Sequence, residues 1–138
     1  MRSTPANEPF VYNPNEVIIT VNGIALTGLG EDMVEFAFDN EQFETAVGAL
    51  GDVVINENNN HLATLTLTLQ ASSPQYSTCL SYAKQGTIFP VWVTNASVGE
   101  RCGGTKARFK KTPDVAYGGS LEDRSLEIQI FDGIHETC

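Results

Sequence analysis

The segment LATLTLTLQ, residues 62–70, decides the fold class of this 138-residue chain. Ala63, Leu65, Leu67 and Leu69 alternate with threonines and a final glutamine, so apolar and polar side chains fall on opposite faces of an extended strand. A helix would scatter these leucines around its axis. The alternation therefore predicts a half-buried β-strand with one face toward a core.

The polar face of this strand carries Thr64, Thr66 and Thr68 and no charge. A strand face in solvent more often carries Lys or Glu, whereas uncharged polar side chains also suit a subunit interface or a wet channel wall. An ordinary exposed face is equally consistent with this row. The three threonines are candidate inter-subunit residues.

Further short segments have strand patterns or follow turn signals. Asn22-Gly23 predicts a hairpin, because both residue types tolerate positive φ. In the last segment Leu126, Ile128 and Ile130 are expected to face the core. The predicted strands cover residues 16–21, 24–26, 33–38, 44–47, 52–55, 88–94, 106–112 and 126–131.

One helix is predicted after the long strand. Ser73 is placed to cap its first turn and Gly86 to end it. Its expected buried face recurs at helical spacing and comprises Tyr76, Cys79, Leu80 and Ala83. With about seven strands, the chain is expected to be mainly β, a β-sandwich or partly closed barrel with one flanking α-helix.

The length fits a single domain over residues 1–138, and residues 1–13, rich in Pro and Asn, are expected to form a flexible arm. No apolar run marks a signal peptide near the N-terminus. The longest apolar stretch, residues 88–93, is too short to cross a bilayer. The chain is therefore expected to fold in a cytoplasm.

Candidate catalytic and metal-binding groups are sparse. Cys79, Cys102 and Cys138 are widely spaced and lack CxxC partners, which argues against a disulfide framework and a zinc site. Cys79 is expected to be buried in the helix, and the other two are interpreted as loop and terminal thiols. His61 and His135 are interpreted as solvated side chains. No enzyme activity and no cofactor or metal are expected.

Charge is segregated along the chain, which has a net charge of −9. Ten carboxylates and no Lys or Arg lie between Arg2 and Lys84, whereas five of the eight basic residues lie within residues 101–111. So acidic a protein repels phosphate, which opposes sequence-specific binding to nucleic acid. One half of the chain is expected to present an acidic surface and the other a basic stripe.

Lys106, Arg108 and Lys110 form this stripe, because they alternate with the apolar Ala107 and Phe109. The simplest interpretation is a solubilising strand edge that prevents unwanted pairing. Docking on the acidic half of a neighbouring copy accounts for both charge blocks at once. The three basic residues are therefore candidate inter-subunit residues.

The order of the predicted elements resembles that of the tail tube proteins of contractile-tailed phages. The block GDVVINENNNHLATLTLTLQASSPQYSTCL, residues 51–80, gives a strand, a polar loop, the long Thr/Leu strand and the start of a helix. FPVWV, PDVAYGG and RSLEIQIF follow it, and the resemblance runs from about residue 13 to residue 131. Related tubes occur in phage-tail-like bacteriocins and in the type VI secretion apparatus.

This resemblance implies a structural virion protein that forms stacked hexameric rings of an inner tail tube. The tube would carry DNA during ejection and would be assembled in the cytoplasm of a bacterial host. The implied partners are other copies of the chain, the tail sheath, baseplate or tail terminator proteins, and double-stranded DNA in transit. Glu35 and Asp39 would line the lumen, since an acidic wall lets a duplex with one charge per ~1.7 Å slide without sticking.

A monomeric β-sandwich binding module for a small ligand or carbohydrate is the alternative. Its binding platform would be aromatic and would comprise Tyr76, Tyr82, Trp92 and Tyr117. Rings or tubes of the purified protein would favour the tail tube, and a monodisperse monomer would favour the binding module.

Overall fold

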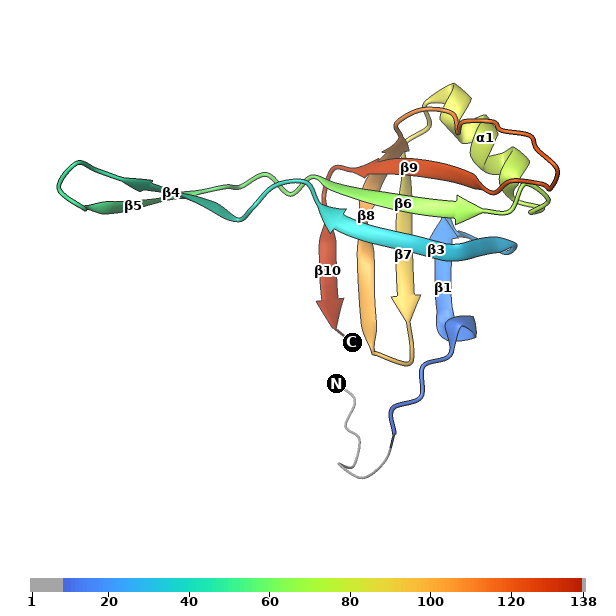
Figure 1. Ribbon diagram of the computed structural model, residues 1–138, viewed down its shortest axis with the longest axis horizontal. Coiled ribbons are helices and arrows are strands. Elements are labelled where there is room, and N and C mark those ends of the chain that lie inside the picture. Colours follow the sequence, from blue (N-terminus) through green and yellow to red (C-terminus); the bar gives the residue numbers. More distant parts are fainter. Residues whose placement is uncertain (1–8, 138) are drawn as a thin grey trace.

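A computed structural model describes residues 9–137 and is mainly β with one α-helix, which confirms the predicted fold class (Figure 1). Residues 1–8 of the predicted N-terminal arm and Cys138 lie outside the described residues, and residues 9–13 form neither helix nor strand. The elements in chain order are η1 (Pro14–Glu16), β1 (Val17–Val21), β2 (Ile24–Ala25), β3 (Leu29–Phe38), β4 (Phe43–Val47), β5 (Val53–Glu57), β6 (Ala63–Leu69), α1 (Tyr76–Gln85), β7 (Phe89–Asn95), β8 (Glu100–Phe109), β9 (Arg124–Ile130) and β10 (Ile134–Thr137). In the described part of the chain, no helix is long and apolar enough to cross a membrane.

The main sheet has the strand order β2-β1-β7-β8-β9-β6-β3, and β10 also pairs with β8. It folds over at β8, so that the part with β1, β7 and β10 crosses the part with β9, β6 and β3 (Figure 1). Strand β8 belongs to both parts, because residues 100–103 pair with β10 and residues 107–109 pair with β9. The two parts enclose one core between them.

Two glycines allow β8 to bend between these parts. A Cβ on Gly103, which has φ +143°, would collide with the carbonyl oxygen of Val91, and a Cβ on Gly104 would lie 2.8 Å from Oδ1 of Asp132. The Asp132 carboxylate holds the bend, because it accepts hydrogen bonds from the backbone N–H groups of Thr105 (3.1 Å) and Lys106 (3.0 Å). Partial burial raises the pKa of Asp132, but the hydrogen bond from the Thr105 hydroxyl, together with those from the two backbone N–H groups, brings it below its ordinary value overall.

The predicted long strand, β6, supplies the centre of the core. Its four apolar residues are fully buried, as predicted, and Leu65 and Leu67 lie opposite Ile128 and Leu126 of β9. The predicted buried face of β9 is also confirmed, because its three apolar residues have no exposed surface. Phe36 of β3 packs against the same core from the other neighbouring strand.

Helix α1 lies where the sequence placed it, but two details of the prediction were wrong. The predicted cap Ser73 donates its hydroxyl hydrogen to the carbonyl oxygen of Thr27 at 2.5 Å, and the helix begins only at Tyr76. Tyr82, with Cys79 and Ala83, faces the core, whereas Tyr76 and Leu80 are only partly buried and lie outside the core cluster. The helix packs on the core through Tyr82 in its last turn, where the Tyr82 ring stacks on buried Phe89.

The buried position predicted for Cys79 is confirmed, but the interpretation of Cys102 as a loop thiol was wrong. Cys102 lies in β8 and is paired with Val93 of β7 and His135 of β10. Burial raises the pKa of both thiols to about 11, and Glu100 adds to the effect at Cys102. Both thiols are therefore protonated at neutral pH.

Strands β4 and β5 form a separate two-stranded hairpin, which projects far from the body of the molecule (Figure 1). The sequence predicted both strands and the turn between them, but not their projection. Every residue of the two strands is exposed. We call residues 43–57 the arm.

Candidate assembly surfaces

The outer surface of β3, β6, β9 and the end of β8 is a continuous polar surface, which we call the polar sheet face. It lies opposite the core, because the apolar residues that alternate with it along these strands point inward. Thr66 lies between Glu35 of β3 and Glu127 of β9, and Thr64 lies between Ala37 and Gln129. The polar sheet face consists of Glu35, Ala37, Asp39, Thr64, Thr66, Thr68, Lys106, Arg108, Lys110, Ser125, Glu127 and Gln129.

Hydrogen bonds cross this face from one edge to the other. Thr64 donates its hydroxyl hydrogen to Asp39 at 2.6 Å, and the Gln129 amide donates to the same carboxylate at 3.0 Å. The ammonium group of Lys110 donates to the Thr64 hydroxyl at 3.2 Å. The hydrogen bonds from Thr64 and Gln129, with a smaller contribution from the charge of Lys110, hold the pKa of Asp39 below its ordinary value. Asp39 is therefore ionised at neutral pH.

The two sets of predicted site residues thus meet on one surface. The sequence assigned Glu35 and Asp39 to a lumen, and the threonine row and basic stripe to contacts between subunits. The structure brings both sets together, with carboxylates on β3 at one side, hydroxyls on β6 in the middle, and cations on β8 at the other side. Arg108 lies against the C-terminus of α1, since a Cβ on Gly86 would come within 2.9 Å of its guanidinium carbon. A cation is favourable there.

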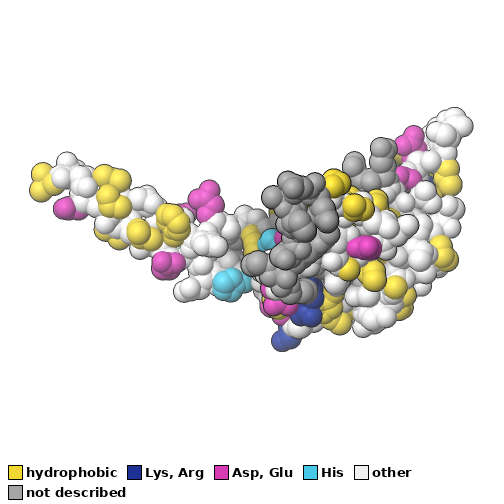
Figure 2. All heavy atoms as spheres, turned by 90° about the horizontal axis from the view of Figure 1, so that it is seen from below, with side chains coloured by type: hydrophobic (Ala, Val, Ile, Leu, Met, Phe, Trp, Pro, Cys, Tyr) yellow, Lys and Arg dark blue, Asp and Glu magenta, His cyan; other side chains and the backbone are white. Residues whose placement is uncertain are grey.

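The arm presents an apolar face that remains exposed among the described residues of the chain. Residues directly opposite each other in the hairpin share a face, so the pairs Thr45–Ile55 and Val47–Val53 lie beside Phe43. Together with Leu50 at the tip, the large apolar residues of this surface are 48% to 94% exposed. The arm also carries Glu44, Asp52 and Glu57 but no Lys or Arg, and Figure 2 shows its apolar and acidic side chains side by side.

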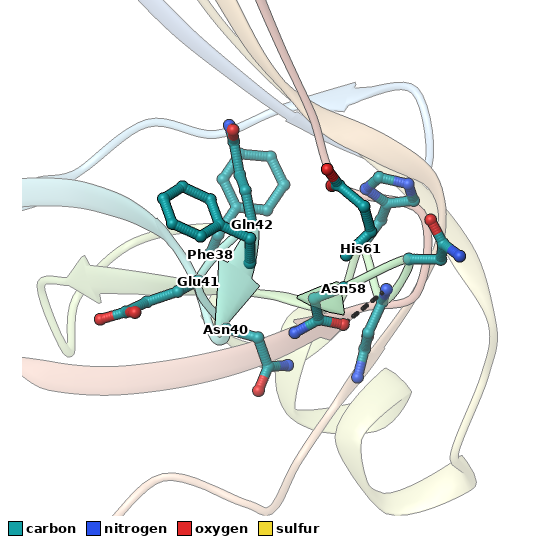
Figure 3. Close-up of a pocket in the computed structure, with 10 residues that line it drawn as sticks. Phe38, Asn40, Glu41, Gln42, Asn58 and His61 are labelled. Atoms are coloured by element: carbon teal, nitrogen blue, oxygen red, sulfur yellow. Dashed lines mark hydrogen bonds between the residues drawn. The ribbon is translucent and has the colours of Figure 1, made fainter. Parts of the chain in front are cut away.

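A cavity of about 680 Å³ lies at the elbow where the arm joins the body (Figure 3). The β3–β6 ladder ends where the Asp39 N–H bonds the Leu62 carbonyl, and the arm's ladder resumes where the Asn58 N–H bonds the Gln42 carbonyl. Between these points the side-chain oxygen of Asn58 accepts from the N–H of Asn60 at 3.0 Å. The elbow is lined by Phe38, Asn40, Glu41, Gln42, Phe43, Glu57, Asn58, Asn59, Asn60 and His61.

The residues interpreted as non-catalytic lie apart from one another. His61 is exposed at the elbow, and His135 contacts the Glu100 carboxylate at 2.6 Å on the β8–β10 pair. On the other face of the same pair, Arg101 forms an ion pair with Glu136 at 3.1 Å. Across the residues that the structure describes, no group of His, Cys, Asp or Glu has the arrangement of a metal site.

The aromatic side chains of the alternative binding module do not form one platform. Tyr82 points inward onto Phe89, whereas Trp92 lies on the outer face of β7, between inward-facing neighbours. The Arg101 guanidinium covers the Trp92 ring at 3.9 Å. Tyr117 lies in the loop after β8 and is 80% exposed.

No protein-family model matches the sequence, and no curated protein matches it either. Solved structures do match the fold. A sheath/tube terminator of the extracellular contractile injection system PVC in its extended state has a TM-score of 0.64 and 9% sequence identity, over 96% of this chain and 100% of that one. The tube-terminating cap of the anti-feeding prophage has a TM-score of 0.63 and 9% identity, over 99% and 97% of the two chains.

A chain of the PVC sheath-tube complex in its extended state has a TM-score of 0.63 and 10% identity, over 99% of this chain and 100% of that one. The chain shares its fold with proteins of contractile injection systems. The similarity covers nearly the whole length of each protein, so it includes the body and the segment that forms the arm. At 9–10% sequence identity, the similarity concerns the backbone fold. The chemistry of the side-chain surfaces follows from this chain's own residues.

Proposed function

We propose that this chain is a structural protein of a contractile tail, and that its copies form stacked hexameric rings of the inner tube. The observation that carries this proposal is the arm. An isolated two-stranded hairpin is at best marginally stable in water, and this one exposes Phe43, Val47 and Ile55 on a single face. Burying each such side chain contributes about 1.5–3 kcal/mol, so a partner that covers the face would order and hold the arm.

A second copy of the chain offers a surface of suitable chemistry for the arm. The loop between β8 and β9 exposes Val115, Tyr117 and Leu121, and Lys111 beside them is also exposed. Lys111 is paired with Asp114, and Glu122 and Asp123 end the loop, so this surface complements the arm through its apolar residues and not through its charge. The arm and the loop lie at opposite ends of the molecule (Figure 1), so contact between them is head-to-tail and continues from copy to copy.

The polar sheet face suits the wall of a channel. Hydroxyl and amide groups fill its middle, and the charges of Asp39 and Lys110 are tied together through Thr64. A wall without large apolar groups or a net positive charge lets double-stranded DNA pass without sticking. The further partners in this role are the tail sheath and the baseplate or terminator proteins, in a particle assembled in the bacterial cytoplasm.

A ring that ends the tube is the second candidate, because two of the three similar structures are described as terminators or caps. Electron microscopy of the purified chain tests both. Tubes of stacked rings are expected for the tube protein, and single rings that do not stack for a terminator. A protein that remains monomeric at high concentration would contradict both functions.

A further inference from the structure

The charge of the polar sheet face changes sign from one edge to the other. Glu35 lies on β3 and Asp39 lies just after it at the first edge, and Lys106, Arg108 and Lys110 lie on or just after β8 at the other. The strands between them are mostly neutral on this face, with Glu127 as the exception, opposite Lys110 across the β8–β9 ladder. The face therefore has an acidic edge at the open strand β3 and a basic edge at the fold along β8, where β8 itself is paired with β7 and β9.

The acidic edge is an open strand edge. Strand β3 is the last strand of the sheet and pairs only with β6 within the described residues. Its regular part, residues 34–38, follows a register shift between Leu29 and Val34. Neither Pro nor Lys protects this part, although natural edge strands are commonly blocked in one of these ways. An open edge of this kind is suited to a neighbouring chain.

The signs of charge select among the possible neighbours. Two copies joined β3 to β3 would bring their acidic edges together, and two copies joined at their β8 ends would oppose their cations. When two copies lie side by side in the same orientation, the acidic edge of one copy meets the basic edge of the next. This contact joins two different surfaces, so it repeats around a ring.

We propose that a second copy docks sideways on β3, with its basic edge against the acidic edge, and that these charges fix the order of copies around a ring. This inference rests on the proposed function and names a contact within it. Repulsion between like edges excludes the reversed arrangement, and attraction between unlike edges sets which side of one copy meets which side of the next. The arm takes no part in this lateral contact.

Two variants test the lateral contact. Glu35→Lys with Ala37→Lys makes both edges basic, and Lys106→Glu with Lys110→Glu makes both acidic; Arg108 is kept because it lies against α1. Matched controls place the same charges on the exposed side of the helix, as Ser77→Lys with Ser81→Lys and as Ser77→Glu with Ser81→Glu. Circular dichroism checks that each variant is folded, and sedimentation velocity measures the fraction that is assembled.

The assembled fraction of each edge variant alone is expected to be at least about tenfold lower than that of the wild type. The helix controls are expected to assemble like the wild type. An equal mixture of the two edge variants is expected to recover assembly, because unlike copies then alternate. If either edge variant assembles alone like the wild type, or if the mixture stays apart, the lateral contact is overturned and the proposed function stands. If the wild-type chain itself never assembles, the proposed function fails and the lateral contact with it.

Discussion

Lys110 and Asp39 lie on opposite sides of the polar sheet face and share one partner, the Thr64 hydroxyl. Thr64 donates its single hydrogen to Asp39 and accepts one from Lys110, so a neutral side chain links an anion to a cation. In the sequence Asp39 lies 25 positions from Thr64 and Lys110 lies 46 positions from it, and the sheet brings the three residues together. Thr64, one residue of the threonine row, is thus part of an ordered charge network.

The first prediction concerns this network. Thr64→Val removes the hydroxyl that contributes most to lowering the pKa of Asp39, so this pKa is expected to rise toward its ordinary value of 3.8. NMR titration of the Asp39 side-chain carboxyl measures the shift. Thr66→Val, two residues along the same face, is the control and leaves the pKa unchanged. An unaltered Asp39 pKa in Thr64→Val would contradict the hydrogen-bond assignment.

The second prediction separates the two faces of the arm. Val47→Ser with Ile55→Ser removes large apolar groups from its apolar face and is expected to prevent the formation of tubes. Ala46→Ser with Val54→Ser changes the adjacent pair on the opposite face and should leave assembly close to the wild type. Negative-stain electron microscopy gives the readout. Equal loss of assembly in both variants would show that the faces do not differ in role.

The third prediction concerns the core. Leu65→Ala leaves a cavity at a fully buried position between β3 and β9, and is expected to lower the free energy of unfolding by about 2–5 kcal/mol. Leu80→Ala, on the partly buried side of α1, should cost about 1 kcal/mol or less. Urea unfolding followed by circular dichroism measures both. Similar losses in the two variants would mean that Leu80 packs into the core after all.

The fourth prediction follows from Asp132 at the bend of β8. Asp132→Asn weakens the hydrogen bonds to two backbone N–H groups, with an expected loss of about 1–3 kcal/mol. Because the pKa of Asp132 is depressed in the folded state, its contribution is fully present above the ordinary value of 3.8 and is lost as the pH falls through the lower folded value. The variant should therefore lose less stability than the wild type over this acidic range.

Urea unfolding at several pH values between neutral and strongly acidic solution tests this sign. Asp114→Asn is the matched control, since Asp114 is a highly exposed carboxylate paired with Lys111 at 3.6 Å. It should follow the pH dependence of the wild type. A steeper acid loss in Asp132→Asn than in the wild type would contradict the assignment.

The sequence predicted those parts of the fold in which local pattern and tertiary role agree. In β6 the alternation of leucine and threonine continues over the whole strand, so its buried face could be identified residue by residue. The turn at Asn22-Gly23 was also predicted, and both residues have the positive φ that this turn requires.

Other elements carry no such signal. The Gly103-Gly104 pair resembles a loop, but here the absence of side chains lets a continuous strand bend against β7 and β9. Strand β10 is short and polar, and it forms because β8 offers it an edge and partners for His135 and Glu136. These elements depend on residues distant in the chain.

The candidate site illustrates the same division. The basic stripe and the threonine row were identified from their alternation, but their position on a single face follows from the strand order, which local pattern does not encode. The arm was predicted as two strands, yet apolar residues in an exposed hairpin look the same in sequence as those of a buried one. Only the structure shows that Val53 and Ile55 face solvent.

The pairing of β1 with β7 has a consequence for the order in which the chain folds during synthesis. Strand β1 has no long partner until residues 89–95 have left the ribosome. At ~5–20 residues per second, the first strand waits on the order of several seconds, paired only with the two residues of β2. Contacts between distant segments also form slowly. The arm and the β3 edge are therefore translated before the body that will carry them is complete, and nascent chains on one polysome could meet through these surfaces too early.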